Sequence, residues 1–494
     1  MYRILSSLLY ILIFASCNAP QIEYSIDNGV VVEKASIISP VDQTISKENY
    51  IIITGDSILY IGTVKPTIKG SFQTINAEGK FIIPGLIDSH VHVTSIDGLT
   101  DKEETQNPEI VKRFKEQLPK SYLYYGYTTL VDLGASKPER LSEFTKTKLR
   151  PDLYFVGGGA VIGNGYGLTN WNDEIPNFIY PEDESYPIPG KYKKENHTPE
   201  AVVKRIAKSG AIAVKTYYEP GFDPTKPRLP VPTVNLINKL KEETHKYNMV
   251  LAAHGNSLEA HRFLGNNDID IIAHGLWNWG NHKIDKSKTL PQEIAQTLDT
   301  EIRNKVYYIP TLQVINGLAA LADTTFLNDP ELANVLPSNL IEYYKENAND
   351  MYIAVFGGAP KEIILNSFDR ISRQGKASLK YMVDNNGLVL FGTDTPSSPT
   401  FGNPPGYNGY LEMLEMHKAG VSLKQILASA TINNAKAYGL EKFYGTLEPG
   451  KKANLLILNK NPLKDISSYN DIDKIIISGK VISRSTLSAK TSEE

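Results

Sequence analysis

The chain has 494 residues, of which 41% are hydrophobic and 22% charged, with a formal net charge of −3. This much apolar surface rules out disorder over most of the length, and the near-neutral charge argues against a dedicated nucleic-acid binder, which needs a basic face. The single cysteine, Cys17, excludes an internal disulfide framework.

Residues 1–16 have the pattern of a secretory signal peptide. A short basic start precedes an apolar run over residues 4–15, which is too short to cross a bilayer as a helix. The segment Phe14-Ala15-Ser16-Cys17 resembles the lipobox of bacterial lipoproteins. This resemblance implies a mature chain that begins at Cys17 and is lipid-anchored in the bacterial cell envelope, on the periplasmic or outer-membrane face. The alternative is an ordinary signal peptide with an incidental cysteine. Residues 17–29 are expected to be a tether.

Both ends of the remaining chain predict β-strands. Residues 30–84 contain short apolar runs separated by turn residues, such as Tyr50–Ile53, and residues 445–485 contain two more, Ala453–Leu458 and Ile475–Ile482. We therefore expect one small β-sandwich module that is built from both segments.

Residues 85–444 alternate short apolar runs with amphipathic stretches, which predicts strands that alternate with helices. Strands are expected over residues 86–87, 128–132, 153–157, 211–216, 250–254, 269–274, 305–309 and 388–392, and helices between them, for example over 109–125, 234–247, 291–304 and 423–438. Eight such units close into an α/β fold of the (β/α)8 TIM-barrel type, whose active sites lie at the C-terminal ends of the strands. Two long segments, 158–197 and 311–385, follow the third and seventh strands and are expected to shape access to that face.

Side chains able to bind a metal end several of the predicted strands. His90 and His92 stand at i and i+2 after an apolar run, so they project to the same side of an extended chain. The ends of other strands carry Lys215, His254, His274 and Asp394. In a barrel these strand ends meet in one ring. Imidazoles together with a carboxylate favour zinc or another divalent ion.

Lys215 is the unusual member of this set. An ammonium group cannot bind a metal, but burial lowers the pKa of lysine and exposes a neutral amine. Such an amine can add carbon dioxide and become a carbamate, an anion able to bridge two metals. The alternative is a lysine that only pairs with Asp132 or another carboxylate.

Together these residues resemble the amidohydrolase superfamily over almost the whole mature chain. The segments 81–92 and 445–455 are similar to its opening and closing motifs. The order of the ligands is similar to the binuclear subgroup with a carbamylated lysine, which includes Xaa-Pro dipeptidase relatives, while the end segments resemble imidazolonepropionase. The resemblance implies two divalent ions, with zinc the expected metal. It assigns His90, His92 and Asp394 to the more buried ion, His254 and His274 to the more exposed ion, and Lys215 as the bridge.

The same resemblance implies a metal-dependent amidohydrolase that hydrolyses a C–N bond in an amide, lactam or dipeptide by means of a metal-bridging hydroxide. Asp394 is expected to take the proton of that hydroxide and to pass it to the leaving nitrogen. Tyr217 or Tyr218 is expected to donate a hydrogen bond to the substrate carbonyl oxygen. Asp88 and Asp132 are expected to hold histidine N–H groups, and the alternative for Asp88 is a cap of the turn that follows it.

Two other functions stay open at this point. A mononuclear deaminase of the same superfamily carries a glutamate three residues after the fifth-strand histidine, where this chain has Ser257. A lipid-anchored binding protein would use a catalytically silent barrel.

The expected partners are a small-molecule or dipeptide substrate and, through a lipid on Cys17, a membrane. Nucleic acid is not expected, and a homo-oligomer is left open. The histidines away from strand ends are expected at the surface, and only the one in the long loop could reach the mouth of the barrel; they are His245, His261, His282 and His417, with His197 in the loop.

Overall fold

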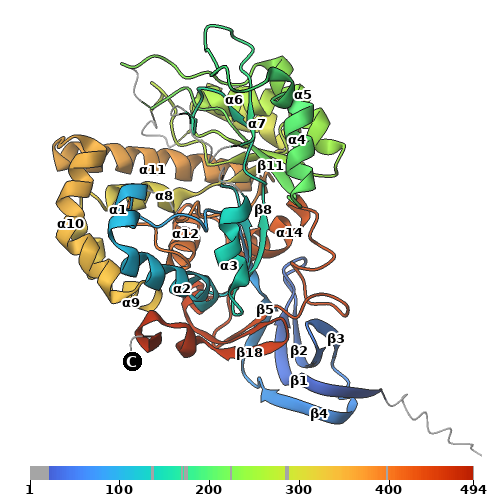
Figure 1. Ribbon diagram of the computed structural model, residues 1–494. Coiled ribbons are helices and arrows are strands. Elements are labelled where there is room, and N and C mark those ends of the chain that lie inside the picture. The colour runs from blue at the N-terminus through green and yellow to red at the C-terminus, as the bar shows by residue number, and fades with distance from the viewer. Residues whose placement is uncertain are drawn as a thin grey trace, which may run out of the picture.

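The computed structural model describes residues 22–492 except 135–137, 169–170, 172–175, 223–224, 284–288 and 397–398. One mixed β-sheet adjoins a larger region in which helices surround parallel strands (Figure 1). The predicted signal peptide, Cys17 and the first part of the predicted tether lie outside the described residues. The first strand begins at Glu23, inside the range expected for the tether, because Glu23 to Ile26 pair in parallel with Thr67 to Gly70.

The mixed sheet takes its eight strands from both ends of the described chain. They are β1 (Glu23–Ile38), β2 (Ile45–Thr54), β3 (Ser57–Gly62), β4 (Thr67–Asn76), β5 (Phe81–Pro84), β16 (Leu455–Leu458), β17 (Ile472–Ile477) and β18 (Lys480–Ser483). Their order is β18-β17-β16-β5-β1-β2-β3, and β4 pairs with β1. Ile82 of β5 pairs with Ile457 on one side and with Ile37 on the other. The strands therefore form one continuous sheet, and the second layer that a sandwich needs stays a prediction.

Eight further strands are parallel to one another within their sheets. One sheet contains β6 (Leu86–Val91), β7 (Tyr127–Asp132) and β8 (Asp152–Phe155), and the other contains β11 (Ala213–Tyr217), β12 (Val250–His254), β13 (Ile271–Ala273), β14 (Tyr307–Ile309) and β15 (Leu388–Val389). Each overlaps one of the strands predicted from the sequence. Backbone hydrogen bonds join the two sheets at both edges, because Ile212 donates to Phe155 and Ser89 donates to Phe391, each over 3.1 Å.

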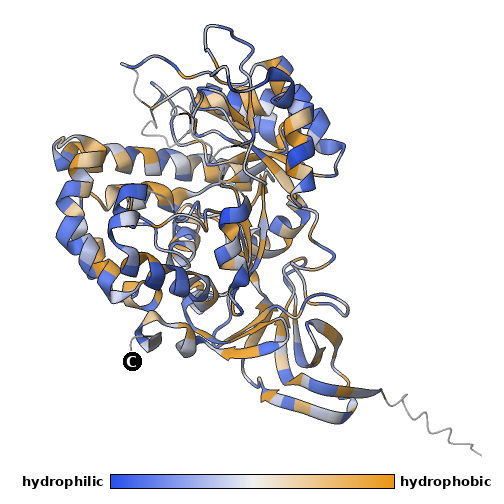
Figure 2. Cartoon of the chain, in the orientation of Figure 1, coloured by the Kyte–Doolittle hydropathy of each residue, from blue (hydrophilic) through white to orange (hydrophobic). Residues whose placement is uncertain are grey.

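Helices follow the parallel strands in the chain, which confirms the α/β class. They are α1 (Asp101–Gln106), α2 (Pro108–Tyr124), α3 (Ser142–Lys146), α4 (Pro199–Lys208), α5 (Val234–His245), α6 (Leu258–Asn266), α7 (Gln292–Arg303), α8 (Leu312–Ala319), α9 (Leu332–Val335), α10 (Ser338–Phe356), α11 (Lys361–Asp384), α12 (Tyr407–Lys418), α13 (Leu423–Ala428) and α14 (Asn434–Ala437). The helix predicted over 423–438 is interrupted, because residues 429–433 form a π-helical turn between α13 and α14. Apolar residues concentrate on the strands, and polar ones on the outer faces of the helices (Figure 2).

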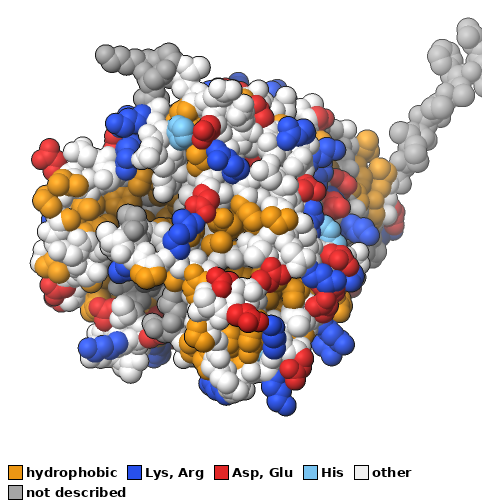
Figure 3. Space-filling view, turned by 90° about the horizontal axis from the view of Figure 1, so that it is seen from above, with side chains coloured by type: hydrophobic (Ala, Val, Ile, Leu, Met, Phe, Trp, Pro, Cys, Tyr) orange, Lys and Arg blue, Asp and Glu red, His pale blue; other side chains and the backbone are white. Residues whose placement is uncertain are grey.

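The two long segments have structures of their own. Residues 158–197 contain the short parallel pair β9 (Val161–Ile162) and β10 (Phe178–Ile179), packed in a cluster with Leu168. Residues 311–385 form α8 to α11, on the left of Figure 1. Within the described ranges no helix is both long and apolar enough to cross a membrane. The face in Figure 3 intersperses acidic, basic and apolar side chains.

Candidate metal centre

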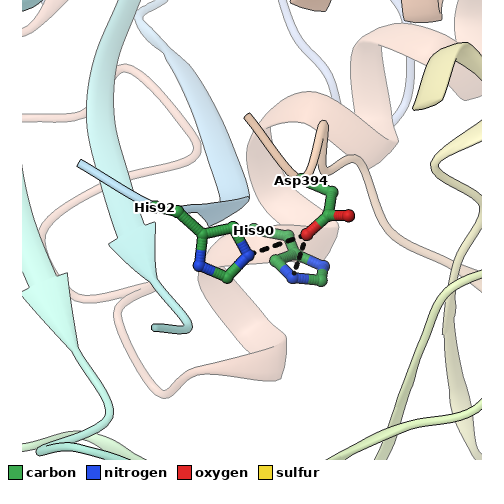
Figure 4. A group of neighbouring side chains, drawn as sticks. All are labelled: His90, His92 and Asp394. Carbon is green, nitrogen blue, oxygen red and sulfur yellow. Dashed lines mark hydrogen bonds and ion pairs between the residues drawn. The ribbon is translucent and has the colours of Figure 1, made fainter. Parts of the chain in front are cut away.

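His90 and His92 converge on a single oxygen of Asp394 (Figure 4). The Nε2 atom of His90 lies 2.9 Å from Oδ1 of Asp394, and Nε2 of His92 lies 2.8 Å from the same oxygen. One potential ligand atom from each residue lies within 4.8 Å of the others. This is the geometry that the i, i+2 spacing predicts, because both rings leave the end of β6 on the same side. The three residues could hold a metal ion.

The backbone around these ligands is fixed by a second carboxylate, Asp88. Its Oδ1 accepts from the backbone N–H groups of His90 and Thr393, over 3.2 and 3.1 Å, and its Oδ2 accepts from the Thr393 hydroxyl over 2.6 Å. The carboxylate of Asp132 also accepts hydrogen bonds from the backbone, from Val93 N over 2.8 Å and from Gly134 N over 2.9 Å. Asp88 therefore binds the backbone of the turn that follows it, as in the alternative considered above, and Asp132 binds backbone instead of the imidazole N–H group expected from the sequence.

His254 and His274 extend the group of imidazoles from β12 and from the end of β13. The ring centroids of His254 and His274 lie 4.5 Å apart, and those of His274 and His90 lie 4.9 Å apart. Nδ1 of His274 lies 3.1 Å from the hydroxyl oxygen of Thr311 and 4.0 Å from Oδ2 of Asp394. The four imidazoles thus form a row of neighbouring rings, in the order His92, His90, His274 and His254, and the first three lie next to Asp394.

Lys215 lies inside β11 and is 1% exposed. Among the described residues it forms no ion pair with Asp132, the pairing considered above as the alternative. Its Nζ lies 5.6 Å from the ring centroid of Tyr217. Burial lowers the pKa of Lys215 to about 7, although the charge of Asp394 partly opposes the shift. A neutral amine, the form that can add carbon dioxide, is therefore accessible near neutral pH.

The pKa values of the histidines and of Asp394 bear on whether this group can bind a cation. Burial, and then the charge of Lys215, lowers the pKa of His90 to about 3. Burial alone would raise the pKa of Asp394, but the imidazoles of His90 and His274 outweigh it and hold this pKa well below its usual range. Nδ1 of His90 is buried without a hydrogen-bond partner. Burial alone would lower the pKa of His92, but the hydrogen bond and the charge of Asp394 outweigh it and raise this pKa. Imidazole nitrogens and an ionised carboxylate are the donors that a divalent first-row ion requires, and such an ion displaces the proton of an imidazole, so the residues present fit it.

The two candidate tyrosines point to opposite faces of the sheet, because side chains alternate along a strand. The ring centroid of Tyr217 lies 5.9 Å from that of His254. The hydroxyl of Tyr218 instead donates to Glu259 over 3.1 Å, and its ring packs against Phe263 at 4.6 Å. The structure therefore brings Tyr217 to the histidines and Tyr218 to the neighbouring helix α6.

Three neighbours of the histidines were not predicted. Glu219 is 4% exposed, and its Oε2 lies 3.5 Å from Nε2 of His254. Tyr166, from the loop 158–197, stacks on His254 with centroids 5.0 Å apart. Trp277 lies 5.3 Å from His274. Glu219 and Tyr166 reach His254 from segments distant in sequence, whereas Trp277 follows His274 by only three residues. The positions of Glu219 just after β11 and of Trp277 just after His274 were the local signals.

Other residues considered from the sequence have roles in packing. Ser257, at the position of the deaminase glutamate, caps α6 by accepting from Ala260 N over 3.2 Å. His261 was expected at the surface, but it is fully buried, with Nδ1 2.8 Å from Oε1 of the equally buried Glu301. His197 stacks on Phe178 at 3.7 Å within the loop cluster.

Comparison with known proteins identifies the family of this chain. The model of the amidohydrolase family matches residues 81–482. A 5'-deoxyadenosine deaminase from Methanobrevibacter smithii is 22% identical over 92% of this chain and 93% of its own. An imidazolonepropionase from Flavobacterium johnsoniae is 21% identical over 88% of this chain and 92% of its own.

Solved structures show a similar fold. The structure of a Xaa-Pro dipeptidase with bound methionine in the active site has a TM-score of 0.62 and 20% identity, over 92% of this chain and 100% of that chain. At this identity the likeness concerns the fold alone. The family match, in contrast, covers well over half of the chain, and this protein is therefore an enzyme of the amidohydrolase family.

Proposed function

We propose that the enzyme is a metal-dependent amidohydrolase that hydrolyses a C–N bond in an amide, a lactam or a dipeptide. One observation carries this proposal: His90 and His92 meet on the same carboxylate oxygen of Asp394, beside two further imidazoles. A largely buried group of imidazoles and one ionised carboxylate binds a divalent cation far better than it serves packing.

The proposed centre holds two ions, with zinc as the first candidate. His90, His92 and Asp394 would hold one ion, His254 and His274 the other, and Lys215, as a carbamate, would bridge them. The burial of Lys215 without an ion-pair partner among the described residues supports the bridge, because an uncharged buried amine is the reactive form. When bound, such ions lower the pKa of a water molecule toward neutrality and polarise a carbonyl group.

Two side chains supply the remaining chemistry. Asp394 would accept the proton of the attacking water and deliver it to the leaving nitrogen, since it is the one carboxylate among the clustered ligands. Tyr217 would donate a hydrogen bond to the substrate carbonyl oxygen, and its place beside His254 supports this role. We also propose that the parallel strands close into a (β/α)8 barrel, which the backbone hydrogen bonds at both sheet edges support.

A panel of substrates tests the reaction. The purified protein, loaded with zinc or manganese, is assayed on N-acyl amino acids, lactams and Xaa-Pro dipeptides, and elemental analysis gives the ions per chain. Hydrolysis of one class with two ions per chain supports the proposal. Two bound ions without turnover on any class would favour the catalytically silent binding protein instead.

A deaminase is the second candidate, because a relative that matches over almost the full length is named 5'-deoxyadenosine deaminase. The helix-capping role of Ser257 speaks against it, since a proton-carrying glutamate is missing at that position. Ammonia release from 5'-deoxyadenosine, with one ion per chain, would decide for deamination.

For the cellular location we propose a lipid anchor on Cys17 in the bacterial cell envelope. The basic start, the short apolar run and the lipobox-like Phe14-Ala15-Ser16-Cys17 support this proposal. The membrane would then be a partner of the enzyme through the lipid, with the barrel in the space next to it.

A further inference from the structure

We propose that Glu219 is a positioning residue for the second metal ion: its Oε2 lies 3.5 Å from the buried Nε2 of His254, and it would accept the Nε2–H of that ring and so leave Nδ1 as the donor to the cation. This inference rests on the proposed function, in which His254 is a ligand. It adds to that function a residue that determines the orientation and tautomer of one ligand.

The place of Glu219 is fixed by the ends of two neighbouring strands. It follows β11, whose Tyr217 pairs in register with His254 at the end of β12. Tyr218 N donates to His254 O over 2.9 Å and ties the two strand ends together. Oε1 of Glu219 accepts from Gly221 N over 2.8 Å, which leaves Oε2 facing Nε2 of His254 at 3.5 Å.

The charge of Glu219 has no other counterpart nearby. The side chain is 4% exposed, and within the described part of the chain no lysine or arginine forms an ion pair with it. A buried carboxylate is costly unless it receives hydrogen bonds or a balancing charge. Nε2 of His254, which is itself buried without a hydrogen-bond partner, lies 3.5 Å from Oε2. A small approach of the two groups would supply the hydrogen bond that this nitrogen lacks, and a cation at the other nitrogen of the ring would supply the charge.

His274, the other proposed ligand of the second ion, also contacts a buried polar side chain outside the ligand set. Thr311 is fully buried and places its hydroxyl 3.1 Å from Nδ1 of His274. His90 and His92, in contrast, contact Asp394 directly. The pair His254 and His274 is therefore oriented by groups outside the ligand set, so its affinity for an ion can be changed without touching the first site.

The chain offers a matched control in His261 and Glu301. This pair is also buried and carboxylate-bound, with 2.8 Å between Nδ1 and Oε1, but it lies between α6 and α7. Replacing Glu301 by glutamine tests what the loss of a buried histidine–carboxylate contact does to folding alone.

The first measurement is zinc binding to the full-length protein, by competition with a chelator, for the wild type, Glu219→Gln and Glu301→Gln. Loss of an outer hydrogen-bond partner of a ligand lowers metal affinity by about 10–100-fold. We expect this loss for the more weakly bound of the two ions in Glu219→Gln, with the tighter ion unchanged, and wild-type affinities in Glu301→Gln.

The second measurement is the tautomer of His254 in metal-free protein, from nitrogen chemical shifts of the ¹⁵N-histidine-labelled chain. Wild type is expected to carry the proton on Nε2, and Glu219→Gln to lose that preference. Wild-type affinities for both ions in Glu219→Gln, or a proton on Nδ1 in the wild type, would overturn the role of Glu219 alone. A wild type that binds no second ion would overturn the binuclear centre together with this role.

Discussion

The ring of Tyr166 stacks on the imidazole of His254, with centroids 5.0 Å apart and the ring planes 26° from parallel. Tyr166 comes from the loop 158–197, whereas His254 ends β12. The same tyrosine lies 5.8 Å from the rings of Tyr217 and Phe222. A loop without regular periodicity thus supplies an aromatic wall to one side of the candidate metal centre.

Tyr166→Ala is expected to raise KM by about tenfold while the metal content stays at the wild-type level. An aromatic contact of this kind contributes about 0.5–1.5 kcal/mol, and its loss opens the site to water. Steady-state kinetics and elemental analysis check this expectation. Tyr166→Phe keeps the ring and should retain the wild-type KM; an equal defect in both variants would mean that the hydroxyl, not the wall, matters.

Lys215→Ala is expected to lose at least one ion per chain and to lower kcat/KM by about 100-fold or more, because the bridge between the ions disappears. Elemental analysis measures the ions, and a ¹³C signal from labelled bicarbonate reports the carbamate in the wild type. Lys376→Ala, which removes a lysine paired with Glu415, is the control. Full turnover with both ions in Lys215→Ala would show that this lysine is not a bridge.

Asp394→Asn is expected to reduce kcat by about 10²–10⁴-fold, the usual contribution of a proton-transferring group. The amide keeps the shape of the side chain but cannot accept the proton of the attacking water. Single-turnover rates separate this step from substrate binding. Asp88→Asn should affect activity less, since Asp88 binds backbone and the hydroxyl of Thr393; a larger defect in Asp88→Asn would contradict the assignment.

Glu412 is expected to make stability depend on pH. It lies in α12, is fully buried, and accepts from Gln313 N at the start of α8 over 2.6 Å. Burial raises the pKa of Glu412 from 4.5 to about 8. Between these values the folded protein keeps a proton that the unfolded chain releases, so stability falls as pH rises through this window.

Urea unfolding of the wild type and Glu412→Gln at pH 5 and pH 8 measures this effect. The stability of the wild type relative to the variant should fall by about 1–4 kcal/mol between the two pH values. Glu243→Gln serves as a control, because lysines lower the pKa of Glu243. The same pH dependence in wild type and Glu412→Gln would assign the titration to another group.

Cys17→Ser is expected to move the protein from the membrane fraction to the soluble fraction of the envelope, because the thiol that would carry the lipid is gone. Fractionation followed by immunoblotting measures the distribution. A protein that stays in the membrane fraction without Cys17 would contradict the anchor.

Much of the candidate site followed from local sequence patterns. The spacing of His90 and His92 placed both rings on one side of β6, and a histidine ends β12 where the apolar run over 250–254 stops. The ends of the strands were informative because the C-terminal ends of parallel strands lie at one edge of the sheet. Side chains at the ends of different strands therefore lie close together.

The remaining features depend on contacts that a local pattern does not contain. Glu219 lies in a turn after β11, and Tyr166 lies in a long loop, so no periodicity indicated that both would meet His254. His261 was expected at the surface because it lies away from the strand ends, but it is buried beside Glu301 of α7. Such pairs become visible only when the helices are packed.

The pairing of β5 with β16 has a consequence for synthesis on the ribosome. Pro84, directly upstream of the strand that carries His90, pairs with Leu455 near the other end of the described chain. Contacts of such large sequence separation form late in folding. A nascent polypeptide stopped before Leu455 would thus leave β5, which directly precedes the strand of His90, without its partner β16, so truncated products should bind the proposed zinc ions more weakly.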